Sequence, residues 1–209
     1  GDRANDALRV DGRELRCKVL VEGGNLGCTQ LGRIEFAQAG GRICTDAIDN
    51  SAGVDTSDHE VNIKILLGLA VGDGELTGKQ RNALLAEMTD DVAALVLRDN
   101  YFQTQVLSVT GRIAPELLDA QQRFVQYLET EGRLHRAIEF LPSDGEFARR
   151  RTNRQGLTRP EAAVLLAYAK MWLFDELVAS SLPDDPWVAS VIARYFPRAL
   201  TERYASYMA

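Results

Sequence analysis

Residues 17–51 read CKVLVEGGNLGCTQLGRIEFAQAGGRICTDAIDNS. The stretch begins with a short β-rich run at 17–25 that ends in glycines. A segment with helical spacing follows at 29–41, and a second short β-rich run occupies 41–51. Strand, helix and strand with short connections form a βαβ unit, in which the two strands are parallel. The stretch therefore predicts an α/β element near the start of the chain.

Start and stop signals bound the predicted helix between the two strands. Thr29 is of a residue type favoured at helix N-caps, and Gly40 with Gly41 forms a stop signal. The apolar residues between these signals recur with helical spacing at Leu31, Ile34, Phe36 and Ala37. A helix is therefore expected over most of 29–41.

A polar loop follows each predicted strand. EGGNLGCT occupies residues 22–29, and DNSAGVDTSDHE occupies residues 49–60. In open parallel sheets, ligands bind beyond the carboxyl ends of the strands. We therefore expect the two loops to converge on one rim and to form a binding site.

From about residue 60 onward the patterns are almost wholly helical. EVNIKILLGLAVG at 60–72 is mostly apolar and ends in a glycine. Within 77–97 the apolar residues fall on one helical face, namely Leu84, Leu85, Met88, Val92, Leu95 and Val96. The sequence thus predicts a mainly α protein with an N-terminal α/β part, in which an incomplete Rossmann-like (parallel βαβ) unit precedes a helical domain.

Several helix starts in this region have recognisable caps. Capping-box spacing occurs in the pairs Thr77 with Gln80, Ser143 with Glu146, and Thr158 with Glu161. Asp185 precedes Pro186, and proline is favoured in the first turn of a helix. We therefore expect separate helices to begin near residues 78, 144, 159 and 186.

The composition excludes several classes of protein. The net charge of −6 argues against a general nucleic-acid binder, which is normally basic. The three cysteines lack paired spacing, which favours a reducing cytoplasm over a disulfide scaffold. Residues 1–16 are charged and lack an apolar signal core. The longest apolar run, 162–174, has 13 residues and includes Lys170, so it predicts a buried helix and no membrane span.

The acidic segment 49–60 has the length of a calcium-binding EF-hand loop but not its ligands. Such a loop needs an oxygen ligand at its fifth position and a glycine at its sixth. Here these positions hold Gly53 and Val54. Zinc-site spacing is also absent from the histidines and cysteines, which are His59, His135, Cys17, Cys28 and Cys44. The sequence therefore predicts no metal site.

Residues 18–67 resemble the end of the cofactor-binding domain of glutamate dehydrogenases, most closely the large NAD-specific bacterial type. Ordinary glutamate dehydrogenases carry Glu-Gly-Ala-Asn after one strand and Asn-Ala-Gly-Gly-Val, followed by Ser and Glu, after the next. Here the two blocks read EGGN at 22–25 and NSAGVDTSDHE at 50–60. Residues 68–209 are similar to the helical C-terminal region of these enzymes, with less distinctive motifs such as LTRPEAAVLLAYAK.

The resemblance implies a role for each polar residue of the two blocks. Gly23, Gly24, Asn25 and Asn50 would bind the cofactor NAD, with both asparagines near its nicotinamide. Glycine lets the backbone approach a ligand closely, and asparagine offers a donor and an acceptor to an amide. Ser57 would donate its hydroxyl to the side-chain carboxylate of glutamate, a bond that the charge strengthens.

Two positions depart from the family pattern. The usual Ala-Gly-Gly reads Ser51-Ala52-Gly53, which would change the reach of the backbone near the nicotinamide. Cys44 stands where the large type is expected to carry asparagine, a change that concerns local packing.

Each assignment also has a purely structural alternative. Asn25 and Asn50 could form turns, because asparagine tolerates left-handed backbone. Ser57 could cap a helix that begins near residue 59. His59 is interpreted as a packed or hydrogen-bonded side chain, with no catalytic role.

The resemblance implies that the whole protein is an NAD-dependent glutamate dehydrogenase, which converts L-glutamate, NAD and water to 2-oxoglutarate, ammonia and NADH. Residues 1–74 would be the C-terminal part of a Rossmann-like dinucleotide-binding domain, and 75–209 a helical C-terminal domain. No catalytic residue is expected in this segment, because the family's catalytic lysine and aspartate and its glycine-rich phosphate loop would precede it. The intact protein is expected to be a cytoplasmic homo-oligomer.

Two alternatives remain at this stage. Another amino-acid dehydrogenase of the same superfamily would share the two motif blocks. A non-catalytic helical interaction or regulatory module would instead fold from residues 68–209 alone and bind a partner protein.

Overall fold

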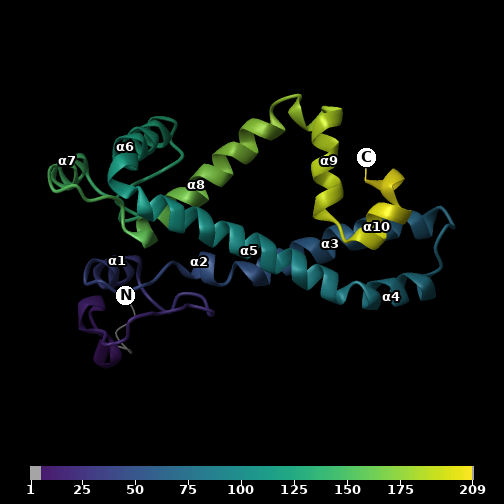
Figure 1. The fold of residues 1–209 in the computed structure, drawn as a ribbon, viewed down its shortest axis with the longest axis horizontal. Helices are drawn as coiled ribbons and strands as arrows, with labels where there is room; N and C mark the ends of the chain where they lie inside the picture. Colours follow the sequence, from purple (N-terminus) through teal and green to yellow (C-terminus); the bar gives the residue numbers. More distant parts are fainter. Residues whose placement is uncertain (1–5, 209) are drawn as a thin grey trace. The chain divides into compact units, whose positions relative to one another are not determined.

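A computed structural model describes residues 6–208 of the chain, and in this range the protein is helical (Figure 1). The α-helices are α1 (Gln30–Gln38), α2 (Asp46–Asp49), α3 (Ser51–Gly72), α4 (Gly78–Glu87), α5 (Thr89–Arg112), α6 (Ala114–Thr130), α7 (Asp144–Thr152), α8 (Arg159–Val178), α9 (Pro186–Tyr195) and α10 (Arg198–Arg203). Short 3-10 helices are η1 (Asp6–Leu8), η2 (Gly12–Glu14), η3 (Leu182–Asp184) and η4 (Ala205–Tyr207).

The predicted Rossmann-like βαβ unit is wrong. From residue 6 to residue 208 there is no β-strand, and the two predicted strands share one isolated parallel bridge, between Val19 and Arg42. The amide of Leu20 donates to the carbonyl of Arg42 at 2.9 Å, and the amide of Arg42 donates to the carbonyl of Lys18 at the same distance. The described chain is therefore all-helical.

The physical reason is that a parallel strand needs neighbours on its edges and cover on both faces. Val19 is 56% exposed and Val21 is 70% exposed, so this segment has no such cover. The second segment turns into α2 at Asp46 after a few extended residues. Two short segments without further strands beside them cannot build a sheet.

Four of the five helix caps predicted from the sequence are confirmed. Thr29 accepts a hydrogen bond from the amide of Gly32 at the start of α1, and Asp185 accepts one from the amide of Trp187 at the start of α9. Capping residues likewise begin α4 and α7, at Thr77 and Ser143. Short-range hydrogen bonding therefore fixes these helix starts.

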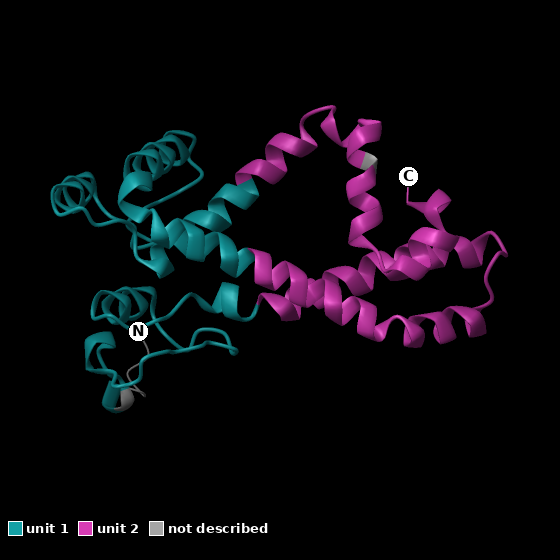
Figure 2. Ribbon diagram, in the orientation of Figure 1, with its two compact units in different colours: residues 1–50, 103–171 teal, residues 51–102, 172–209 magenta. Residues whose placement is uncertain are grey.

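The chain forms two compact units (Figure 2). The first comprises Gly1–Asn50 and Gln103–Met171, and its residues 1–5 lie outside the described part. The second comprises Ser51–Phe102 and Trp172–Ala209. The boundary placed after residue 74 on sequence grounds remains a prediction.

Each unit has its own apolar interior. In the first unit, the buried side chains include Phe36, Ile43, Leu118, Val125, Leu128 and Phe147. In the second, a cluster from α3, α4, α10 and the residues that flank α4 contains Ile63, Leu66, Leu67, Ala70, Leu76, Leu84, Met88 and Leu200. Among residues 6–208, no helix combines the length and apolarity needed to cross a bilayer.

The segment 49–60, predicted as a loop, is helical. Asn50 alone separates α2 from α3, with φ −103° and ψ 11°. Ser51 to Glu60 forms the first turns of α3, so no helix begins near residue 59. The predicted capping role of Ser57 is therefore wrong.

Candidate functional site

The segment EGGNLGC at 22–28, here called the glycine loop, is closed by a buried glutamate in the first unit. Glu22 is 6% exposed, and its Oε1 accepts from the amide of Cys28 at 2.9 Å. Arg33 of α1 donates to both carboxylate oxygens of Glu22, through Nε at 2.6 Å and Nη2 at 2.9 Å. This buried, bidentate pair ties the two ends of the loop to each other and to α1.

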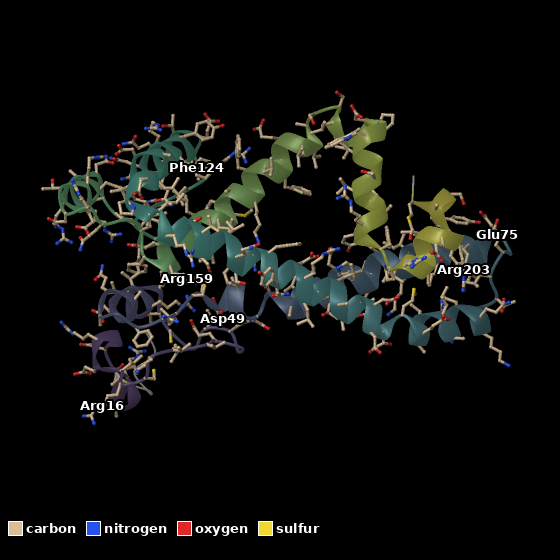
Figure 3. All side chains as sticks on the ribbon, viewed as in Figure 1. Arg16, Asp49, Glu75, Phe124, Arg159 and Arg203 are labelled. Atoms are coloured by element: carbon tan, nitrogen blue, oxygen red, sulfur yellow. The ribbon has the colours of Figure 1, made fainter. Side chains whose placement is uncertain are left out.

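Helix α2 holds the same loop at two further points. The amide of Glu22 donates to Asp49 Oδ2, and the amide of Leu26 donates to Asp46 Oδ2, both at 2.9 Å. Asp49, at the end of α2, is labelled in Figure 3. Arg33 Nη2 also lies 3.2 Å from Asp46 Oδ1. Two carboxylates of one short helix therefore position the start and the middle of the loop.

These contacts keep Asp46 ionised. The amide of Leu26 lowers the pKa of the Asp46 carboxyl most, with help from the amide of Ala47 and the charge of Arg33. A carboxylate that accepts several N–H donors is stabilised in its charged form. The Asp46 anchor therefore stays ionised at a pH low enough to protonate an ordinary aspartate.

The tip of the glycine loop is open. Gly23, Gly24 and Asn25 are exposed, and a Cβ built on either glycine would meet nothing within 4 Å. Leu26 is 87% exposed and has a φ of 61°, a conformation that costs a non-glycine residue free energy. The hydrogen bonds to Asp46 and Glu22 hold this strained turn, and they leave residues 23–25 accessible to a ligand.

The structure brings together the two asparagines predicted to bind the cofactor. Asn50 Nδ2 donates to Asn25 Oδ1 at 2.9 Å. Each side-chain amide carries two donors and one acceptor oxygen. The pair therefore leaves the amide nitrogen of Asn25 as a donor and the amide oxygen of Asn50 as an acceptor for a ligand.

The predicted substrate residue, Ser57, belongs to the second unit. It is exposed on α3, and its Oγ donates to the carbonyl of Gly53 at 3.3 Å. A bond to the carbonyl four residues earlier is a common alternative for a serine inside a helix. Because this hydrogen bond is long, the Ser57 hydroxyl can readily leave the Gly53 carbonyl and donate to a stronger acceptor.

The thiols of Cys28, which is half-buried, and Cys44, which is buried, are not activated nucleophiles. Burial raises the pKa of the Cys28 thiol, and the charge of Glu22 raises it further. Burial likewise raises the pKa of the Cys44 thiol, which lies in the interior as expected for a packing position. Thiolate chemistry needs the opposite shift.

Two groups of residues escaped the sequence reasoning. The first is the Glu22–Arg33 pair, which is formed between a loop and a helix and has no periodic signal. The second is a cluster in the second unit, in which His59 Nε2 lies 3.8 Å from Asp55 Oδ1 and 3.9 Å from Asp99 Oδ2. The i, i+4 spacing of Asp55 and His59 was visible in the sequence, whereas the contribution of Asp99 from α5 was not.

Comparison with known proteins identifies the family. Residues 1–110 match the family described as "Bacterial NAD-glutamate dehydrogenase, catalytic domain", and residues 154–209 match "Glutamate dehydrogenase, C-terminal". The resemblance drawn from residues 18–67 is thus confirmed. The chain belongs to the bacterial NAD-glutamate dehydrogenase family.

Curated relatives carry the same name. The chain is similar to the NAD-specific glutamate dehydrogenases of Halomonas elongata, 53% identical, and Pseudomonas aeruginosa, 55% identical, each over 208 residues. It is 50% identical to that of Mycobacterium tuberculosis over 204 residues. These matches cover 98–100% of this chain but 13% of each relative. The chain therefore spans a small part of the length of these enzymes.

Proposed function

We propose that the protein containing this chain is an NAD-dependent glutamate dehydrogenase. It would oxidise L-glutamate with NAD and water to 2-oxoglutarate, ammonia and NADH. The family of the chain and the names of its relatives support this reaction. Within it, the cofactor carries the redox chemistry and the protein orients the cofactor against the substrate.

The contribution of this chain is a wall beside the nicotinamide, built from Gly23, Gly24, Asn25 and Asn50. The observation that carries the proposal is the Asn25–Asn50 hydrogen bond at the tip of an anchored loop. The nicotinamide carboxamide has one acceptor oxygen and one donor NH₂. A donor on Asn25 and an acceptor on Asn50 are its complement.

Gly23 and Gly24 would form part of the same cofactor-binding surface. Neither has a positive φ or a close neighbour that requires glycine. The space that a Cβ would take is open, so the backbone at Gly23 and Gly24 is free to approach a bound cofactor.

Ser57 would contact the side-chain carboxylate of glutamate. To do so its hydroxyl exchanges the long bond to Gly53 for one to a charged oxygen, which contributes about 1.5–3 kcal/mol. Ser57→Ala should therefore lower kcat/KM for glutamate roughly ten- to a hundred-fold. The loss should be much smaller for norvaline, which lacks the carboxylate.

The experiment that tests the proposal is steady-state kinetics on the full-length enzyme. Asn25→Ala and Asn50→Ala should each raise KM for NAD about two- to tenfold, the effect of one hydrogen bond. Asn153→Ala is the matched control, since Asn153 is an exposed asparagine at the end of α7. If all three variants had the KM of the wild type, these asparagines would not be part of the cofactor site.

The remaining functional expectations concern the intact protein. The catalytic lysine and aspartate and the phosphate loop are expected elsewhere in it, so the isolated 209-residue chain should not reduce NAD. The free thiols of Cys17, Cys28 and Cys44 support a cytoplasmic location. A homo-oligomeric state is proposed on the family resemblance.

A further inference from the structure

The second unit contains a three-residue cluster that the proposed dehydrogenase chemistry does not use. Asp55 and His59 lie one turn apart on α3, so their side chains share a face of the helix. Asp99 comes from α5. One nitrogen or oxygen of each residue lies within 4.8 Å of the corresponding atoms of the other two.

The imidazole in this cluster has unmet hydrogen-bonding capacity. His59 is fully buried, at 0% exposure, and neither ring nitrogen has a hydrogen-bond partner among the described residues. Asp55 Oδ2 is also buried and also lacks a hydrogen-bond partner among the described residues. Buried polar atoms are nearly always satisfied, because leaving one without a hydrogen bond is unfavourable. Unmet atoms from adjacent side chains indicate that a further group belongs between them.

The spacing of the three residues suits a metal ion. At 3.8 and 3.9 Å, His59 Nε2 is too far from the aspartate oxygens for a direct hydrogen bond. Two metal bonds of about 2.1 Å at a tetrahedral angle separate their donors by about 3.4 Å. If each His–Asp separation shortened by about half an ångström in total, these distances would match those between two donors on one cation.

A neighbouring aromatic ring holds the imidazole of His59 in place. The ring of Tyr195 stacks on His59, with centroids 4.4 Å apart and planes inclined by 22°. The Tyr195 hydroxyl donates to Asp58 Oδ2 at 2.9 Å and accepts from Asn62 Nδ2 at 2.8 Å. This stacking fixes the orientation of the His59 ring, and groups around a metal ligand commonly have that effect.

Asp99 is oriented in a similar way. Arg98 Nε donates to Asp99 Oδ1 at 2.9 Å, which leaves Oδ2 directed towards His59. The Asp99 side chain is 37% exposed and that of Asp55 is 23% exposed, so an ion can enter from solvent. The cluster thus combines two oriented ligands, His59 and Asp99, with an entry path.

We propose that Asp55, His59 and Asp99 bind one divalent transition-metal cation of the zinc or manganese class. His59 Nε2 and one oxygen of each aspartate would be the ligands, and water would complete the coordination. The donor set decides the class, because imidazole suits transition metals, carboxylates suit hard divalent ions, and thiolate is absent from the set. The bound ion would cross-link α3 to α5 within the second unit.

This site differs from the calcium loop that the sequence analysis rejected. The EF-hand positions within residues 49–60 and the zinc spacing among the histidines and cysteines predicted no metal site, and the proposed site departs from that prediction. The proposed site takes two ligands from that window and the third from another helix.

The test is calorimetric titration of the metal-stripped full-length protein with Zn²⁺, using His59→Gln and Asp99→Asn. Glu60→Gln is the matched control, because Glu60 is the exposed neighbour of His59 on α3 and pairs with Lys64. Wild type and control should bind one more equivalent of zinc than either site variant, or bind it at least tenfold more tightly. The same stoichiometry and affinity in all four proteins, or no zinc binding by the wild type, would overturn the proposal.

Hydrogen exchange of the wild type keeps the proposal testable if the variants fail to fold. Zinc should slow amide exchange in the first turns of α3 and around Asp99 in α5, because the ion cross-links them. Exchange that is the same with and without zinc in these two segments would contradict the site. This readout is independent of NAD binding and of turnover, so it does not depend on the dehydrogenase function.

Discussion

Replacing Arg33 with methionine should open the glycine loop. The change keeps an unbranched side chain in α1 but removes every guanidinium donor to Glu22 and to Asp46. The Glu22 side chain is 4% exposed and that of Arg33 is 8% exposed, so the variant leaves a carboxylate buried without its countercharge. Breaking one side of a buried ion pair costs about 3–5 kcal/mol.

The loss should be seen in local amide exchange of the full-length enzyme. The amides of Leu26 and Cys28 donate to Asp46 and Glu22, the two carboxylates that Arg33 contacts. At about 1.4 kcal/mol for each factor of ten, their exchange should be roughly a hundredfold faster or more. Arg42→Met is the matched control, because Arg42 is an exposed arginine of the same unit.

A second substitution separates the charge from the packing. Glu22→Gln in the Arg33→Met background removes the unpaired charge but keeps an oxygen that can accept from Cys28. Most of the protection of residues 22–28 should return. If the double variant exchanged as fast as Arg33→Met, or if Arg33→Met matched Arg42→Met, the ion pair would not be what anchors the loop.

Three further changes have definite expected outcomes. Gly24→Ala should leave thermal stability within about 0.5 kcal/mol of the wild type, because its Cβ meets nothing within 4 Å, yet raise KM for NAD; an unchanged KM would show that the cofactor does not approach this backbone. Gly156→Ala should destabilise the first unit by about 1–3 kcal/mol in thermal or denaturant unfolding, because its Cβ would overlap the Ala114 Cβ and lie 2.6 Å from the Ala114 carbonyl oxygen. Wild-type stability of this variant would mean that the backbones at Gly156 and Ala114 can separate without cost. Arg149, and then Arg150, lowers the pKa of Glu146 from 4.5 to about 2. A depressed carboxyl pKa stabilises the fold above the unfolded value, so about 1–2 kcal/mol, after allowance for solvent screening, should be lost as pH falls from 4.5 towards 2; Glu146→Gln should flatten that part of the acid-unfolding curve, and an unaltered curve would refute the assignment.

The features that the sequence predicted well are local ones. The caps at Thr29, Thr77 and Asp185 follow from hydrogen bonds between residues two or three positions apart. The apolar positions Leu84 and Met88 lie in the core for the same reason, since a helical period needs no information beyond the helix itself. His59 is packed, as the sequence interpretation held.

The features that failed depend on distant parts of the chain. A β-rich run becomes a strand only when other strands lie beside it, and the described chain offers residues 17–25 and 41–51 one bridge. The polar segment 49–60 has weak helix formers, yet it is helical and buries His59 at the start of a helix that continues into the apolar residues Ile63 and Leu67.

The contacts of charged side chains are even harder to predict from the sequence. Glu22, Arg33 and Asp99 are of residue types that usually lie on the surface. No periodic pattern in the sequence distinguishes them from other charged residues. Their pairing is fixed by the three-dimensional arrangement of a loop and helices, so only the structure reveals it. The family motifs identified Asn25 and Asn50 as cofactor-binding residues but did not predict the hydrogen bond between them.

The most direct test of the central claim is a cycle between the asparagine pair and the carboxamide of the cofactor. The kcat/KM of the full-length enzyme is measured with NAD and with its 3-acetylpyridine analogue, in which a methyl group replaces the amide NH₂. Asn50→Ala should lower kcat/KM for NAD about two- to tenfold and leave that for the analogue nearly unchanged, because the analogue has no NH₂ to donate to Asn50. Equal losses with both cofactors would contradict the claim that this pair of side chains binds the nicotinamide carboxamide.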